Sequence, residues 1–229
     1  MTARSRMIDL SQDGGDGALG GVKAVVFDLD GTLYVSRELG EEIAAVAARY
    51  LAERRGITPE EADRLIRETK AELTARTGFR SSLSHATIEL GGDLRELHCR
   101  FAAEIDPSPF LVRDERVIRF LRDLARRAEL ILYTNNNRSL AERILAGLGL
   151  ARAFRRVVTI EESWRPKPDR QTLEEIIGAA GVCPEECLFV GDRYDIDLRL
   201  PAELGCQVYL SRSVDELLAL HSIMSEEHR

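Results

Sequence analysis

Short, continuous apolar runs recur along this chain and constrain its fold more than any other feature. They lie at Val22–Phe27, Glu129–Tyr133, Val157–Ile160, Leu188–Gly191 and Gln207–Leu210. Runs of this kind are typical of parallel strands that are buried on both faces of a sheet. Apolar residues at helical spacing separate the later runs, as in Leu173, Ile176 and Ile177. This alternation predicts an α/β fold with a doubly wound, mostly parallel sheet.

One interval, from about Arg37 to Asp106, contains helical patterns but no convincing strand. Within it, Thr58 and Glu61 form a capping-box pattern that predicts the start of a helix. An insert of about seventy residues is too long for an ordinary loop. We therefore predict a helical cap domain over residues 37–107, inserted after the first strand. The Rossmann-like core then comprises residues 21–36 and 108–229, and the glycine-rich residues 1–20 are expected to form a flexible tail.

Composition and charge exclude several classes of partner. The 229 residues include 39 acidic and 32 basic side chains, a net charge of -7, which argues against nucleic acid as the main partner. No apolar run approaches the roughly 18 residues of a membrane span, and the N-terminus lacks a secretory pattern. We therefore expect a cytoplasmic protein with no membrane partner. Its cysteines are expected to be reduced thiols, namely Cys99, Cys183, Cys187 and Cys206.

Polar residues follow the predicted strands, at the sheet edge where ligands bind in open α/β folds. They are Asp28 and Asp30 after the first strand (in VVFDLDGTLY), Thr134 and Asn135 after the second, Lys167 after the third, and Asp192, Asp195 and Asp197 after the fourth. Crowded carboxylates need a cation to neutralise them, and hard oxygen ligands suit Mg²⁺. Thr134 and the amides that follow it suit a phosphate at a helix N-terminus. Together these groups predict phosphoryl transfer.

On these residues the sequence resembles the haloacid dehalogenase superfamily, specifically its phosphatase branch. The resemblance extends from Val22 to Leu220. Four motifs carry it in order: Asp28-Leu29-Asp30-Gly31-Thr32, Thr134, Lys167, and Gly191-Asp192 with Asp197. Each motif alone is a weak signal, whereas all four at successive strand ends are specific.

The resemblance implies a catalytic role for each acid of the first motif. Asp28 would be the nucleophile. Asp30 would protonate the leaving oxygen and then activate water, and its backbone carbonyl would face the metal. Dehalogenases of this superfamily lack an acid at the position of Asp30, because halide leaves as an anion. The presence of Asp30 therefore favours phosphate chemistry.

The resemblance also implies the phosphate and metal ligands. Thr134 and the Asn135 amide would hold the phosphate, and Lys167 would steady it against Asp28. The Mg²⁺ ligands would be Asp28, Asp30, Asp192 and Asp197, with Asp197 acting directly or through water. Asp195 is either a solvent-facing or capping acid or a second motif-four acid near the metal or its waters, and Trp164 is either a packing residue or a surface on which substrate stacks.

The helical insert resembles the C1-type cap of the superfamily and, in its early part, the pyrimidine 5'-nucleotidase-like subgroup. That subgroup usually has Asn at the position of Gly31, and its fourth motif differs from GDRYDID. The cap segment from Gly78 to His85 is rich in hydrogen-bond donors. It is either an ordinary connection or a specificity loop in which Arg80 and His85 contact substrate.

Together these features predict a Mg²⁺-dependent phosphatase that hydrolyses small phosphorylated metabolites through an aspartyl-phosphate intermediate. A phosphotransferase or mutase of the same superfamily is the alternative among enzymes. A catalytically silent protein that binds a phosphorylated ligand is the alternative outside enzymes, and the intact acids of the motifs argue against it.

Overall fold

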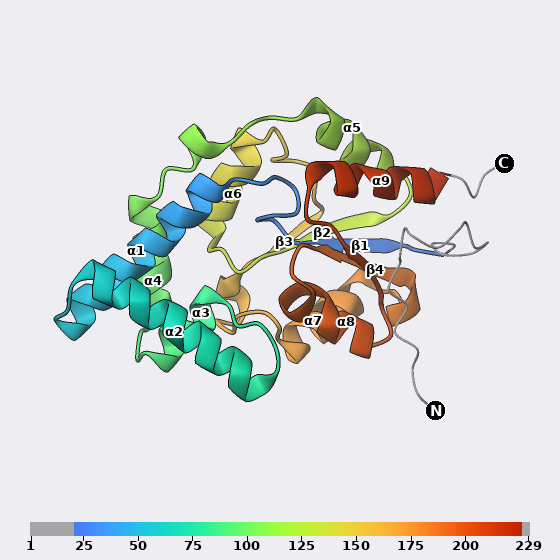
Figure 1. Ribbon diagram of the computed structural model, residues 1–229. Coiled ribbons are helices and arrows are strands. Elements are labelled where there is room, and N and C mark those ends of the chain that lie inside the picture. Colours follow the sequence, from blue (N-terminus) through green and yellow to red (C-terminus); the bar gives the residue numbers. More distant parts are fainter. Residues whose placement is uncertain (1–20, 226–229) are drawn as a thin grey trace.

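The computed structural model describes residues 21–225, so the predicted tail at residues 1–20 lies outside the described residues. At its centre is a five-stranded parallel sheet in the order β3-β2-β1-β4-β5 (Figure 1). The strands are β1 (Ala24–Phe27), β2 (Glu129–Tyr133), β3 (Arg156–Val158), β4 (Cys187–Gly191) and β5 (Gln207–Leu210). The prediction of an α/β, doubly wound parallel sheet is confirmed.

The register of the sheet brings the ends of three strands level. Phe27 at the end of β1 lies opposite Leu132 of β2 and Val190 of β4. Because these strands are parallel, the residues that follow them emerge at the same edge. The polar residues after β1, β2 and β4 are therefore brought together although they are far apart in the sequence.

Helices cover both faces of the sheet. Alternate residues of β1 point to opposite faces: Val25 and Phe27 to one core cluster, Ala24 and Val26 to the other. The first face packs against α5 (Glu115–Leu124), α6 (Arg138–Gly147) and α9 (Val214–Ser225), and the second against α7 (Arg170–Ala180) and α8 (Arg199–Glu203). Burial on both faces explains why the strands are apolar throughout.

Two strands are shorter than predicted. β1 begins at Ala24 rather than Val22, and β3 spans Arg156–Val158 rather than 157–160. Ile160 instead begins the short 3₁₀ helix η2 (Ile160–Glu162), in which the Glu162 carboxylate accepts from the backbone N–H of Thr159. This local capping bond competes with extension of the strand.

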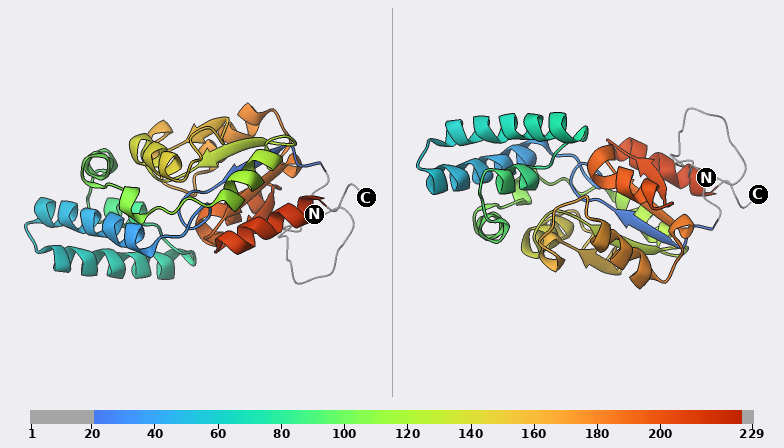
Figure 2. Two further views of the ribbon diagram at one scale, coloured as in Figure 1. Left: turned by 90° about the horizontal axis from the view of Figure 1, so that it is seen from above. Right: turned by 90° about the horizontal axis from the view of Figure 1, so that it is seen from below.

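The helices between β1 and α5 form a layer beyond the carboxyl edge of the sheet (Figures 1 and 2). They are α1 (Arg37–Arg55), α2 (Pro59–Thr77), α3 (Leu83–Glu89) and α4 (Leu94–Glu104). The capping box at Thr58 and Glu61 is present, with the Glu61 side chain accepting from the Thr58 N–H at 3.0 Å. No helix within residues 21–225 is long and apolar enough to cross a membrane.

A buried histidine lies where α4 meets the core. The His98 ring is 2 % exposed and packs edge-on against Phe101 and Trp164. The Asn137 side-chain amide donates to the His98 carbonyl at 3.0 Å, and the Arg95 guanidinium lies 4.5 Å from the Trp164 ring centroid. Trp164 therefore packs between α4 and the core, and neither ring nitrogen of His98 has a hydrogen-bond partner among the described residues.

We predict that His98 makes folding sensitive to acid. Burial lowers the pKa of His98 from 6.5 to about 4. Between these values the unfolded chain binds more protons than the folded chain, so stability falls as pH falls. From pH 7 to pH 5 the loss should be about 2 kcal/mol from this residue. Urea unfolding at pH 7 and pH 5 should show that the free energy of unfolding falls about 2 kcal/mol less in His98→Phe than in the wild type. An identical pH dependence in both proteins would contradict the prediction.

Candidate active site

Three carboxylates, one directly after β1 and two from the segment after β4, converge at the carboxyl edge of the sheet. Oxygen atoms of Asp28, Asp192 and Asp197 all lie within 4.8 Å of one another. Two glycines allow this approach. A Cβ at Gly31, where φ is +86°, would lie 2.6 Å from Asp192 Oδ2, and a Cβ at Gly191 would lie 2.5 Å from Asp197 Cβ. The DxDGT and Gly-Asp patterns are thus required by packing as well as by chemistry.

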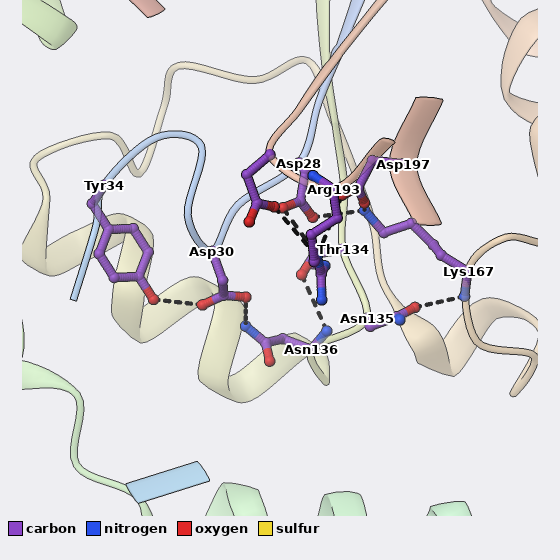
Figure 3. A network of polar contacts seen from close by, with 10 residues as sticks. Asp28, Asp30, Tyr34, Thr134, Asn135, Asn136, Lys167, Arg193 and Asp197 are labelled. Carbon is purple, nitrogen blue, oxygen red and sulfur yellow. Dashed lines mark hydrogen bonds and ion pairs between the residues drawn. The ribbon is translucent and has the colours of Figure 1, made fainter. Parts of the chain in front are cut away.

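A buried lysine joins two of these acids (Figure 3). Lys167 Nζ lies 2.6 Å from Asp28 Oδ1 and 2.8 Å from Asp197 Oδ1, and all three side chains are about 3 % exposed. The Asn135 side-chain oxygen accepts from the Lys167 backbone N–H at 2.8 Å and so fixes this loop on the end of β2. Burial alone would lower the pKa of Lys167, but Asp197 and Asp28 outweigh it and raise the pKa, so the ammonium stays charged.

The pKa values of the two acids that share this lysine shift in opposite directions. Burial and the neighbouring Asp197 raise the pKa of Asp28 to about 7, although Lys167 opposes the shift. Burial would also raise the pKa of Asp197, but Lys167 and Arg193 outweigh it and hold that pKa below its ordinary value. Asp197 therefore holds its negative charge more readily than Asp28, although both depend on the cations around them.

Asp30 lies apart from this cluster and has its own partners. The Tyr34 hydroxyl donates to Asp30 Oδ1 at 2.5 Å, and the Asn136 side-chain amide donates to Asp30 Oδ2 at 2.7 Å (Figure 3). Burial raises the pKa of Asp30, and the Tyr34 hydrogen bond offsets part of the rise. A carboxyl group with a raised pKa is suited to exchange protons near neutral pH. The sequence places Asn136 among the amides after the second strand, but it did not reveal that Asn136 and Tyr34 donate hydrogen bonds to Asp30.

Thr134 follows β2 directly and is almost fully buried. Its Oγ1 accepts from the Asn136 backbone N–H at 3.1 Å, which holds the turn between β2 and α6. Asn137 caps α6 by accepting from the Leu140 N–H. Thr134 is therefore placed between the carboxylate cluster and a helix N-terminus, where backbone N–H groups favour an anion.

Arg193 is a site residue that sequence reasoning missed. Its guanidinium lies 3.3 Å from Asp192 Oδ1, 3.5 Å from Asp197 Oδ2 and 4.0 Å from Asp28 Oδ2. The only sequence signal is its position directly after Asp192. The predicted acids of the fourth motif thus come together with a cation that the motif does not specify.

The structure does not bring the predicted specificity residues Arg80 and His85 into this cluster. The Arg80 backbone N–H donates to Asp195 Oδ2 at 3.0 Å, so Asp195 contacts the cap segment while Asp197 belongs to the three-acid cluster. His85 Nδ1 lies 2.8 Å from Ser82 Oγ at the start of α3. No hydrogen bond or ion pair joins either side chain to the three acids within residues 21–225.

A family model for haloacid dehalogenase-like hydrolases matches residues 22–205. The chain belongs to this family. Glyceraldehyde 3-phosphate phosphatase of Methanopyrus kandleri is 29 % identical over 183 residues, 78 % of this chain and 78 % of that protein. Phosphoglycolate phosphatase of Pseudomonas savastanoi pv. phaseolicola is 30 % identical over 189 residues, 80 % of this chain and 68 % of that protein. The prediction of a phosphatase of this family agrees with these relatives.

A solved structure shows the same fold. The haloacid dehalogenase (HAD) phosphatase of Thermococcus onnurineus superposes with a TM-score of 0.57 at 22 % identity, over 91 % of this chain and 100 % of that one. Its match spans both the sheet and the helices beyond its carboxyl edge. At this identity the likeness supports the haloacid dehalogenase fold alone.

The three acids of this haloacid dehalogenase-like hydrolase fit a divalent cation such as Mg²⁺. All three offer hard oxygen ligands at a common point. Asp28 Oδ2 and Asp192 Oδ1 are buried without a hydrogen-bond partner in the described part of the chain. Because buried carboxylate oxygens without partners are costly, a cation at this point would stabilise them.

We predict that Lys167→Met strongly destabilises this hydrolase. The change leaves Asp28 and Asp197 buried without their shared ammonium, and loss of one partner of a buried ion pair costs about 3–5 kcal/mol. Arg165→Met, which removes a surface ion pair with Asp169, should cost at most about 1 kcal/mol. Urea unfolding at neutral pH with a chelator would measure both, and equal small losses would contradict the prediction.

Proposed function

We propose that this chain is a Mg²⁺-dependent phosphatase that hydrolyses small phosphomonoesters through a phosphorylated Asp28. The arrangement of the two acids of the first motif carries the proposal. Asp28 is joined to a buried lysine at 2.6 Å, whereas Asp30 accepts hydrogen bonds on both of its oxygens and has a raised pKa. One acid is thus suited to attack and the other to transfer protons.

In the first step an oxygen of Asp28 attacks phosphorus, and the bond from phosphorus to the ester oxygen breaks. Asp30 gives its proton to that oxygen, so the product leaves as a neutral alcohol. In the second step a water molecule attacks the phosphorus of the acyl phosphate. Asp30 accepts the proton of this water, and Asp28 leaves as a carboxylate, which restores both residues.

The surrounding residues neutralise and position the phosphoryl group. Thr134 and the amide of Asn135 would bind its oxygens, and Lys167 would hold it close to Asp28. The side chains of Asp28, Asp192 and Asp197, with the backbone carbonyl of Asp30, would hold Mg²⁺. When bound, Mg²⁺ supplies positive charge that lets an anionic substrate approach these acids.

The helical layer α1–α4 is proposed to act as the cap of this active site, over the predicted range 37–107. Its position beyond the carboxyl edge supports this role, because a cover there would exclude water from the reaction. The substrate is proposed to be a small phosphorylated metabolite, in line with the named substrates of the relatives. Those relatives also favour hydrolysis over transfer to a second substrate.

Asp28→Asn should lower kcat for an aryl phosphate at least about a thousandfold while the fold is retained, because an amide is a poor nucleophile of the same size. The matched control is Asp123→Asn in α5, a half-exposed acid outside the carboxylate cluster, which should leave kcat within about twofold. The wild-type protein should also lose activity on exhaustive chelation and regain it when Mg²⁺ is added. Near wild-type turnover by folded Asp28→Asn, or full activity after chelation, would contradict the proposal.

Arg80 and His85 are proposed to contact the part of the substrate beyond the phosphate. The chain segment that carries them is joined to the segment after β4 by the bond from Arg80 to Asp195. We predict that Arg80→Ala or His85→Ala lowers kcat/KM for the preferred metabolite roughly ten- to a hundredfold. Hydrolysis of a small aryl phosphate should be spared, because it lacks the contacted group. Equal losses on both substrates, or no change on either, would contradict the assignment.

A further inference from the structure

The Arg193 guanidinium faces the same carboxylate oxygens that a divalent cation would need. Its nearest oxygens belong to Asp28, Asp192 and Asp197, at 3.3 to 4.0 Å. These are the three acids whose oxygens lie within 4.8 Å of one another. Lys167 contacts the other oxygen, Oδ1, of both Asp28 and Asp197, so the two cations approach these carboxylates at different oxygens.

The contacts of Arg193 differ in kind from those of Lys167. Lys167 makes two short hydrogen bonds, at 2.6 and 2.8 Å. By contrast, Arg193 Nε, Asp28 Oδ2 and Asp192 Oδ1 are all buried without a hydrogen-bond partner among the described residues. Arg193 therefore supplies charge at a distance but does not satisfy these atoms, whereas an ion coordinated by the oxygens would.

We propose that Arg193 is a displaceable counterion of the metal site. It offsets part of the charge of the three carboxylates when they lack Mg²⁺, and it competes with Mg²⁺ for their oxygens. This inference rests on the Mg²⁺ site of the proposed function and adds a residue that sets the affinity of that site. Its side chain is 35 % exposed, so it has room to move toward solvent when the ion enters, unlike Lys167 at 3 %.

Lys70 of α2 provides a matched control for the charge of Arg193. It is half-buried and lies close enough to Arg193 that burial and the guanidinium together lower its pKa. No ion pair joins Lys70 to any of the three acids in residues 21–225. Removing this ammonium changes the net charge near the site without freeing a carboxylate oxygen.

Calorimetric titration with Mg²⁺ tests the competition. Arg193→Met should lower the Mg²⁺ dissociation constant about tenfold or more, because it removes a competing charge from the ligands. Lys70→Met should change it less than about twofold, because no ion pair joins its ammonium to any of the three acids within residues 21–225. An unchanged or higher dissociation constant in Arg193→Met, or an equal gain in Lys70→Met, would overturn the proposal.

A second measurement uses the wild-type protein and does not depend on folding of a variant. Arginine-specific dicarbonyl labelling, followed by peptide mass spectrometry, would compare the protein in chelator and in saturating Mg²⁺. Labelling of Arg193 should rise several-fold with Mg²⁺ as the guanidinium leaves the carboxylates. Arg126, which pairs with Asp123 near the end of α5, should be labelled equally in both conditions. Unchanged or reduced labelling of Arg193 with bound Mg²⁺ would overturn the proposal.

The two experiments also separate this inference from the proposed function. If wild-type protein and Arg193→Met both fail to bind Mg²⁺, the metal part of the proposed function is wrong. If both bind it with the same affinity, the metal site stands and only the role of Arg193 is wrong.

Discussion

The need to neutralise buried carboxylates at one edge of the sheet governs this structure. Asp28 and Asp197 are both about 3 % exposed and repel one another, which is part of the reason that the pKa of Asp28 rises to about 7. Among residues 21–225, Lys167 is the one cation that forms short hydrogen bonds with both. Parallel strands bring these groups together from distant parts of the chain, and the glycines beside them permit the close approach. The charges that would bind phosphate and metal are also the charges that are costly to bury. The groups proposed for catalysis therefore lower the stability of the folded chain.

The segment after β4 links this charge cluster to the helices beyond it. The π-helical turn Tyr194–Leu198 carries Asp197, which faces Lys167, and Asp195, which accepts from the Arg80 backbone. On the next turn the Arg199 guanidinium lies 3.8 Å from the ring centroid of Phe79. A movement of the helical layer would break these contacts within two residues of a proposed metal ligand. The proposed cap and the proposed metal site therefore both contact this one segment.

Much of this arrangement was predictable from the sequence, because local patterns determine it. Continuous apolar runs predicted the strands, and the capping box at Thr58 predicted the start of α2. The position of each polar residue directly after a strand predicted that these residues lie at the carboxyl edge of the sheet. The apolar pattern did not reveal that Ile160 lies outside β3. The strand ends before it because the backbone N–H of Thr159 donates to the Glu162 carboxylate instead of continuing the sheet. Nor did the pattern reveal the partners of Tyr34, Asn136 and Arg193, because these contacts depend on how loops fold back in space. The residue types in a motif indicate the class of reaction, whereas the neighbours that shift the pKa values and offset the charges of those residues are determined by packing.

The central claim is that Asp28 carries the phosphoryl group during turnover. The most direct test is to quench the enzyme with acid during steady turnover of an aryl phosphate in Mg²⁺. Borohydride then reduces an acyl phosphate to an alcohol, and peptide mass spectrometry locates the altered residue. The account predicts that Asp28 alone is reduced, only when substrate and Mg²⁺ are both present. Reduction at another residue, or an unmodified Asp28 in an enzyme that turns over with a rate-limiting second step, would contradict it.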